Sequence, residues 1–587
     1  MFNFQKMLKI NRFSSLFFFC FVILFISLIR FINLNSDPHS IVYRDVITDE
    51  GWFTQNARNH YLFNDWVLDE HNPAYILCPI YTFAERFIFS LFGNTLYSSR
   101  ILSAVSLSLV CILIIVRFFK NRNIALLVTL LVVSNPYLFF YSRTAFVESF
   151  QLLAITCTWY FSSFQKSKKI LFLRFLSGVF AAIAVFIKPS AGIIIMFAVF
   201  SPWAANLNKR FNEKAKESLF VVCGGLLIIV FMLPFFLSEI ELFFIEFSRE
   251  SSLISIENGF NGLATPLYYG LVKPWESGNF KLPGYNLVFV PILFLLTILA
   301  FSRSNGAKTS KTGNNELDYI VRTSVLWLIF IQISFFSQST LHIEPRYWIN
   351  MFIPISIILI IKLFGINNFK NTYYRLSKIS AIFGIFLIIY ILRPQTLQIF
   401  SNTFHIKSKF IITILLTTVI IFGSVILGLI AEKLLRKMRL NSQMIQLVSR
   451  SMVIIVILFW SMFGIISVFN SSFTLESAIV DINSIIGDGA VLTGGVANTL
   501  SIGSKRYAFV TRNLESMNMG VGIINDDWNE KGVTNIIETI EENGVKREQQ
   551  TWLPYGTAIP IKTYNLLPDS KLPTGYRFKV LLSEWHK

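Results

Sequence analysis

The stretch LYSSRILSAVSLSLVCILIIVR, residues 96–117, decides the fold class of this protein. Between Ile101 and Val116 it contains no charged residue. At about 1.5 Å per residue, a helix of this length is about 33 Å long, enough to cross the roughly 30 Å hydrocarbon core of a bilayer. The basic segment FFKNR (118–122) follows at once. The stretch therefore predicts a transmembrane helix with a charged loop at its end.

The composition of the whole chain agrees with this prediction. Of its 587 residues, 53% are hydrophobic and 60 are Phe, and the mean hydropathy is +0.57. Charged residues make up 15%, against about 25% in soluble domains. A soluble chain of this length cannot bury so much apolar surface, so a water-soluble globular enzyme is excluded. The five cysteines form no CxxC pattern, so the sequence offers neither a disulfide framework nor a zinc motif.

Thirteen apolar runs are long enough, or nearly so, to span a bilayer. They lie near 14–34, 96–117, 123–141, 146–164, 170–187, 190–205, 218–237, 286–302, 322–338, 346–364, 377–392, 409–431 and 451–469. No small-residue cleavage site follows the first run, which is typical of a retained anchor. We therefore expect an all-α polytopic membrane protein.

Basic residues indicate the orientation of these runs. When the N-terminus is placed in the cytoplasm, every short loop on that side is basic, as the positive-inside rule requires. These loops contain about half of the 52 Lys and Arg residues, so the net charge of +18 is mostly a topology signal. A nucleic-acid partner is therefore not expected. An odd number of spans places the C-terminal tail on the outer face, and we expect a bacterial inner (plasma) membrane protein.

Three long segments then lie outside: 35–95, 238–285 and 470–587. The first two mix aromatic and charged residues, which favours helices lying in the membrane interface. The last has an ordinary soluble composition, with strand-like runs at 490–493, 507–510 and 521–524 and a helical stretch at 535–543. We expect a transmembrane domain over 1–470 and a small outer α/β domain over 471–587.

The first candidate site is the acidic pair Asp49-Glu50 in TDEGWF (48–53), about fifteen residues after the first span. Two interpretations are open. Thr48 or Asp49 could cap a helix whose positive end favours both carboxylates. Alternatively, a rigidly held carboxylate at the outer membrane face could serve as a catalytic base.

Further ionisable residues lie at predicted outer ends of spans, where such groups are functional candidates. Arg143 and Glu148 flank a tight outer turn, and an ion pair between helices would explain them structurally. Lys188 ends a span, where its amine could simply reach the interface. In HIEPRYW (342–348), a helix beginning at Pro345 would place Arg346 and Tyr347 at a good phosphate site. His342 and Glu344 could hold a divalent metal, although two ligands make a weak motif.

The sequence TDEGWFTQNA (48–57) resembles the Asp-Glu motif in the first outer loop of GT-C fold glycosyltransferases. The similarity is to the protein O-mannosyltransferase-like group (glycosyltransferase family 39-like), which includes the lipid A aminoarabinose transferases. It covers about residues 10–365 and includes RTAFVE (143–148) and the Arg346-Tyr347 pair. It departs at ILCPI (76–80), where aminoarabinose transferases have a Lys-Pro-Pro-Leu-like run; Lys188 or Arg143 would then replace that lysine.

The resemblance implies inverting transfer of a sugar from a polyprenyl-phosphate donor to an acceptor on the outer (periplasmic or extracellular) face. The acceptor would be a lipid, a glycan or a protein, and membrane lipid surrounds the enzyme. Asp49 would be the base and Glu50 would orient it or the acceptor. The candidates for binding the donor phosphate are Arg58, Arg143, Lys188, Arg346 and Tyr347. The alternative is a flippase or transporter, or a polymerase or ligase, of lipid-linked saccharides. Transporters often contain internal repeats, and we find none in this sequence.

Overall fold

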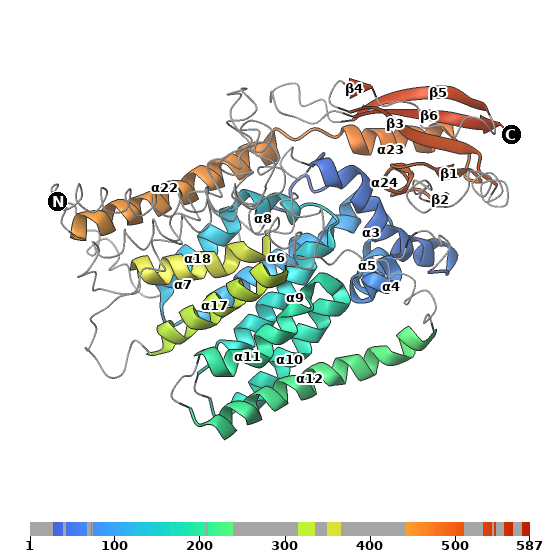
Figure 1. The fold of residues 1–587 in the computed structure, drawn as a ribbon. Helices are drawn as coiled ribbons and strands as arrows, with labels where there is room; N and C mark the ends of the chain where they lie inside the picture. The colour runs from blue at the N-terminus through green and yellow to red at the C-terminus, as the bar shows by residue number, and fades with distance from the viewer. Residues whose placement is uncertain are drawn as a thin grey trace, which may run out of the picture.

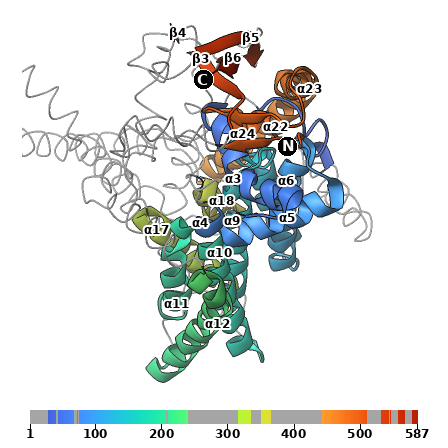
Figure 2. The same cartoon turned by 90° about the vertical axis from the view of Figure 1, so that its right-hand side faces the viewer.

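A computed structural model describes a helical bundle with a small sheet at one end (Figure 1). The described residues are 28–38, 43–66, 72, 74–165, 167–205, 209–238, 315–334, 349–364, 442–509, 532–542, 545–546, 557–566 and 578–586. In a view turned by 90°, the sheet again lies at the end of the bundle that holds α3, and α12 extends away from it (Figure 2).

Three helices of the described chain are long and apolar enough to span a membrane: α6 (Leu96–Arg117), α10 (Ile170–Ile187) and α12 (Phe211–Ser238). A fourth apolar stretch, Val453–Ile485, comprises most of α22 (Ser442–Phe469) and, after a break, α23 (Thr474–Ile485). Helix α6 has the predicted bounds because Thr95 and Ser98 form a capping box at its first turn. Its long uncharged run then continues the helix to the basic loop.

Further helices complete the described part of the bundle. They are α7 (Arg122–Ser134), α8 (Pro136–Tyr141), α9 (Val147–Ser162), the 3-10 turn η1 (Pro189–Ala191), α11 (Ile193–Ala205), α17 (Asn315–Ser334) and α18 (Ile349–Phe364). The predicted run 123–141 is divided between α7 and α8, because Pro136 begins a new helix that Asn135 caps. The runs predicted at 286–302, 377–392 and 409–431, and most of 14–34, lie outside the described residues.

Glycines allow α10 and α12 to pack closely. A Cβ atom added to Gly178 would overlap the carbonyl oxygen of Val221, and one added to Gly224 would overlap that of Phe175. Small residues at such crossings bring the backbones of apolar helices into van der Waals contact, which drives helix association where the hydrophobic effect cannot. This crossing fixes the first half of α10 against α12.

The first predicted outer segment is helical, with α3 (Tyr43–Phe63), α4 (Ala74–Leu77) and α5 (Pro79–Phe92). Helix α5 buries Tyr81 and Phe89 but exposes Phe87, Leu91 and Phe92. An apolar exposed side next to a buried one is typical of a helix lying in the membrane interface. The second predicted outer segment, 238–285, lies almost entirely outside the described residues.

The C-terminal sheet is mixed, with the strand order β2-β1-β3-β6-β5 and β4 paired to β3. Its strands are β1 (Val491–Thr493), β2 (Tyr507–Phe509), β3 (Asn535–Glu542), β4 (Val545–Lys546), β5 (Thr557–Leu566) and β6 (Phe578–His586). Strand β1 runs parallel to β2 and β3, whereas β6 is antiparallel to β3 and β5. The short helix α24 (Ala497–Leu500) follows β1. We call residues 474–586 the outer part, after the location predicted for them from the sequence.

The predicted helix at 535–543 is wrong, because these residues form β3. In the sheet, Ile536 and Ile537 are both buried but belong to different apolar clusters, so the strand is covered on both faces. A strand buried on both faces has no alternation of apolar and polar residues to distinguish it from a helix. Pairing with β1 and β6 decides its conformation, and local sequence does not.

Candidate active site

Helix α3 carries the acidic pair, but the pair does not cap it. The helix begins at Tyr43, so Asp49 lies in its second turn and the capping interpretation is wrong. Asp49 is half-buried. Phe53 follows one turn later and therefore lies on the same side of α3. We call the side that carries Asp49 and Phe53 the Asp49 face.

Glu50 points in another direction and forms a buried ion pair with Arg100 of α6. The two side chains are 0% and 1% exposed, and the pair is bidentate: Arg100 Nε lies 2.8 Å from Glu50 Oε1, and Nη2 lies 2.6 Å from Oε2. The backbone N–H of Ala145 also donates to Oε1, at 2.7 Å. A carboxylate with these partners is held rigidly. Glu50 therefore fixes α3 against α6 and the turn before α9.

Arg100 also orders the segment that leads from the first span. Its Nη1 donates to the carbonyl oxygens of Leu34 (2.9 Å) and Ser36 (2.5 Å). Arg100 lies near the start of the predicted span 96–117, and the sequence alone indicated no role for it. A charged side chain near the start of an otherwise apolar span costs free energy unless it is paired, so its position in the sequence already indicated that a partner exists.

Glu148 forms its ion pair with Lys188. The pair between Glu148 and Arg143 that the sequence suggested is therefore wrong. Lys188 is the C-cap residue directly after α10, Glu148 lies in the first turn of α9, and Lys188 Nζ is 2.5 Å from Glu148 Oε1. The ammonium also lies 5.5 Å from the centre of the Phe53 ring, a cation–π distance. Since Phe53 shares the Asp49 face, the structure brings a cation to the side of α3 that carries the predicted base.

Arg143 takes a structural position. Its guanidinium donates to the carbonyl oxygens of Arg30 (2.6 Å), Ile32 (2.8 Å) and Asn33 (2.7 Å), and so covers the end of the segment that begins at residue 28. These bonds satisfy backbone acceptors that otherwise have no partner near the end of a helical stretch. The geometry favours this role for Arg143 over contact with a donor phosphate.

Arg58 is buried and lies nine residues after Asp49, which is roughly 13 Å along the helix. It donates to the carbonyl oxygen of Arg506 in the outer part. Burial lowers the pKa of Arg58 to about 10, and Tyr507 partly opposes that effect. Its distance from Asp49 separates it from the face where the cation of Lys188 lies.

Glu85 of α5 is a further buried carboxyl group that analysis of the sequence missed. It is fully buried, and neither carboxylate oxygen has a hydrogen-bond partner among the described residues. Burial raises the pKa of Glu85 well above its usual range, and the charge of Glu50 adds to this effect. Burial therefore favours the neutral, protonated form of this group. Its place in an amphipathic helix, where an acidic residue is easily taken for a solvated one, left no signal in the sequence.

The last predicted cluster cannot be placed. His342, Glu344, Arg346 and Tyr347 lie outside the described residues, and α18 begins just after them at Ile349. Within the part of the chain that the structure describes, no three His, Cys, Asp or Glu side chains come together as a metal site would require.

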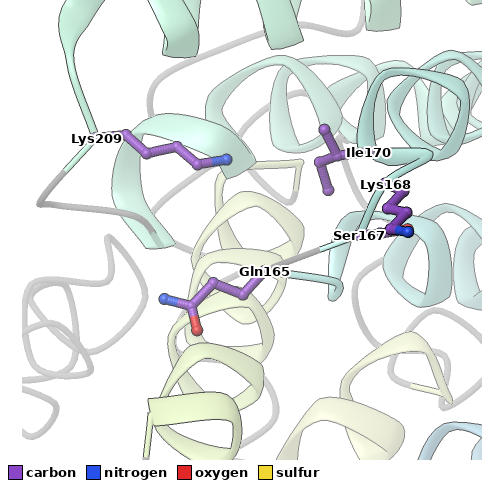
Figure 3. Close-up of a pocket in the computed structure, with 5 residues that line it drawn as sticks. All are labelled: Gln165, Ser167, Lys168, Ile170 and Lys209. Carbon is purple, nitrogen blue, oxygen red and sulfur yellow. The ribbon is translucent and has the colours of Figure 1, made fainter.

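A cavity of about 540 Å³ lies at the other end of the bundle (Figure 3). Its lining residues are Gln165, Ser167, Lys168, Ile170 and Lys209, from the α9–α10 and α11–α12 connections. Helix α10 begins at this cavity and ends beside Lys188, so the two places are separated by its length, about 27 Å. The cavity is therefore not part of the Asp49 face.

Comparison with known proteins relates this arrangement to a fold. Residues 73–237 match the family model described as dolichyl-phosphate-mannose-protein mannosyltransferase. No curated protein sequence matches the chain. The structure is similar to ArnT from Cupriavidus metallidurans in the apo state, with a TM-score of 0.54 and 12% identity over 97% of this chain and 98% of that one. ArnT from the same organism bound to undecaprenyl phosphate gives 0.54 and 14% over 96% and 97%.

These matches support the GT-C fold and do not test the predicted number of spans or the roles of the site residues. The likeness extends over nearly the whole of both chains, so it includes the outer part as well as the bundle. A TM-score of 0.54 shows a shared fold, and identities of 12% and 14% do not transfer an activity. The protein is a membrane protein with the GT-C fold of the glycosyltransferases.

Proposed function

We propose that the protein is a membrane glycosyltransferase that moves a sugar from a polyprenyl-phosphate carrier to a hydroxyl or amine on the outer face. The single observation that carries the proposal is the position of Lys188 beside Phe53, on the side of α3 that also carries Asp49. A half-buried carboxylate and a cation, on rigid helices at one end of a membrane bundle, are the two groups this reaction needs.

Asp49 is the proposed base. In the reaction, the acceptor oxygen or nitrogen attacks the anomeric carbon while the bond from that carbon to the phosphate oxygen breaks. The proton of the acceptor passes to Asp49, and the electron pair of the broken bond goes to polyprenyl phosphate. Attack opposite the leaving group inverts the anomeric carbon. A phosphate is already a good leaving group, so no general acid is required.

Lys188 is the proposed contact for the donor phosphate. Its side chain is 15% exposed, so it is accessible, and its pair with Glu148 holds it beside Phe53. A fixed ammonium stabilises the charge that develops on the leaving phosphate. Two of the comparisons favour a lipid phosphate: one concerns ArnT bound to undecaprenyl phosphate, and the family model is named for dolichyl-phosphate-mannose. Arg346 and Tyr347 remain proposed contacts on the same grounds as in the sequence.

The proposed orientation follows from the loops. The basic loops place the cytoplasm at the end of the bundle where α10 and α12 begin, so Asp49 and the outer part face the outside. The cavity lined by Lys168 and Lys209 lies at the basic end, which agrees with this assignment. The N-terminus is then cytoplasmic and the protein is a multi-pass protein of the plasma membrane.

A transfer assay tests the proposal. Purified protein in nanodiscs is given a panel of polyprenyl-phosphate monosaccharides with crude membrane extract as acceptor source, and released polyprenyl phosphate is scored. We expect release by the wild type and by the control Asp488→Asn, whose carboxylate is 89% exposed, but not by Asp49→Asn. Full activity of folded Asp49→Asn would refute the base. No release from any donor would favour the flippase or the polymerase and ligase alternatives.

A second pair of variants tests the phosphate contact. Lys188→Met alone would leave Glu148 buried without this cation, so it is combined with Glu148→Gln to keep the protein folded. We expect the double variant to raise the KM for donor by about 10-fold or more and to leave acceptor use nearly unchanged. Arg346→Ala should act in the same direction. Equal effects on donor and acceptor would count against a phosphate role for either residue.

A further inference from the structure

The outer part contacts the helix of the acidic pair along a single stripe. Gly51, Gln55 and Arg58 are spaced four and three residues apart and therefore lie on one side of α3. The N–H of Gly51 donates to Thr499 Oγ1 at 3.1 Å, Gln55 Nε2 donates to the carbonyl oxygen of Ala508 at 2.7 Å, and Arg58 donates to that of Arg506. Every member of the stripe thus has a partner in the outer part.

The contact at Gly51 brings two backbones together. A Cβ atom added there would overlap the backbone of Asn498 and Thr499 in α24. Glycine is therefore required by the close approach of α24, since no positive φ is recorded at this position. One turn on, Asn498 Nδ2 donates to Gln55 Oε1 at 2.6 Å and extends the same contact.

Three sides of α3 are consequently held by three different elements. The Asp49 face packs near Lys188, the next residue is paired with Arg100 of α6, and Gly51 rests on α24. Successive residues of a helix point about 100° apart, so contacts on these sides leave α3 no freedom to rotate about its axis. The direction of the Asp49 carboxylate is set by that rotation.

The outer part has its own attachment to the bundle. Asp37 accepts hydrogen bonds at 2.8 Å from the N–H groups of Thr474 and Leu475 at the start of α23, and Asn94 Nδ2 donates to the carbonyl oxygen of Ser504 at 3.1 Å. Because these contacts do not involve α3, the outer part is a fixed reference against which α3 packs.

We propose that Gly51, Asn498 and Thr499 are positioning residues for the reaction, through which the outer part aims the carboxylate of Asp49 at the acceptor. The proposal rests on the proposed function. In it, these three residues contact neither the donor nor the reacting atoms, and they act only by fixing the position of α3. Misplacing a reacting group by about 1 Å can cost about 100-fold in rate, so a contact that fixes one helix is sufficient to control turnover.

The experiment uses the full-length protein and four variants. Gly51→Ala forces the two backbones apart, Thr499→Val removes the acceptor for the Gly51 N–H, and Thr499→Ser keeps it. Gly495→Ala is the matched control, because a Cβ atom there meets nothing within 4 Å. Kinetics of polyprenyl phosphate release and hydrogen–deuterium exchange of the α3 amides are measured for each.

We expect Gly51→Ala to lower kcat by about 100-fold and Thr499→Val by about 10-fold, with the donor KM within about twofold of the wild-type value. Thr499→Ser and Gly495→Ala should behave as the wild type. Exchange of the amides after Gly51 should rise only in the two impaired variants. Ala is a better helix former than Gly, so faster exchange in Gly51→Ala would have to come from the lost contact.

Two results would overturn the positioning role. One is an active wild type whose Gly51→Ala and Thr499→Val variants keep its kcat. The other is a fall in kcat with no change in the exchange of α3. Failure of the proposed function would look different, because the wild type itself would then release no polyprenyl phosphate.

Discussion

Removal of Arg100 should destabilise the protein strongly while leaving the proposed base in place. Both side chains of the Glu50–Arg100 pair are almost completely buried, and Arg100→Leu would leave the Glu50 carboxylate with only the N–H of Ala145 among its recorded partners. Breaking a buried pair in this way costs about 3–5 kcal/mol, because an uncompensated charge stays in the interior. The variant also removes the donors to Leu34 and Ser36, which pushes the expected loss toward the upper end of that range.

The assay is SDS-induced unfolding in mixed micelles, in a double-mutant cycle with Glu50→Gln. The double variant buries neither charge, so it should be more stable than the sum of the single losses predicts, by about 2 kcal/mol. Asp49→Asn, which leaves the pair intact, should change stability by less than about 0.5 kcal/mol.

Additive losses would show that the two side chains do not stabilise the protein as a pair. If Glu50→Gln kept full stability but abolished sugar transfer, Glu50 would be a catalytic group and the structural role assigned to it would be wrong.

Three further predictions concern other parts of the molecule. Gly178→Leu should prevent α10 from packing on α12 at Val221, so the thermal midpoint should fall sharply, whereas Gly225→Ala, with its nearest neighbour 3.7 Å away, should have little effect; equal midpoints would contradict the crossing. Asp37→Ala should cost about 1 kcal/mol and speed hydrogen exchange at the start of α23, whereas Asp37→Asn, which keeps one of the two acceptor oxygens, should have a smaller effect; unchanged exchange in the alanine variant would contradict this role of Asp37. The raised pKa of Glu85 means that the folded state holds a proton which the unfolded chain has lost, so stability falls as pH rises above about 4.5 toward the folded pKa; Glu85→Gln should therefore be more stable than wild type at pH 8, and a less stable variant would refute the neutral carboxyl.

Much of the bundle could be predicted because a span is a local property. A run such as 170–187 is apolar enough to be recognised without its neighbours, and α10 has the same bounds. Breaks were harder: the run at 123–141 reads as continuous, although Pro136 divides it into two helices. Strand β3 was mistaken for a helix because burial on both faces removes the periodic signal.

The candidate site was predicted in its residue types and not in its pairings. Asp49, Glu50, Glu148 and Lys188 were all named from the sequence, yet Glu148 was expected to pair with Arg143, and Arg100 was given no partner. A charged side chain in an apolar segment shows that some partner must exist, because of its solvation cost. That cost does not say which of several residues of opposite charge is the partner.

The sequence alone determined that this is a membrane protein, where most of its described helices lie and which acidic pair stands at the proposed outer face. These properties depend on residues within one helix length of each other. Only the tertiary structure decided that Glu50 binds Arg100 and that Gly51 meets Thr499, which is 448 residues away along the chain. Pairing over such separations depends on how whole helices pack, and packing is a property of the folded chain that no local pattern records.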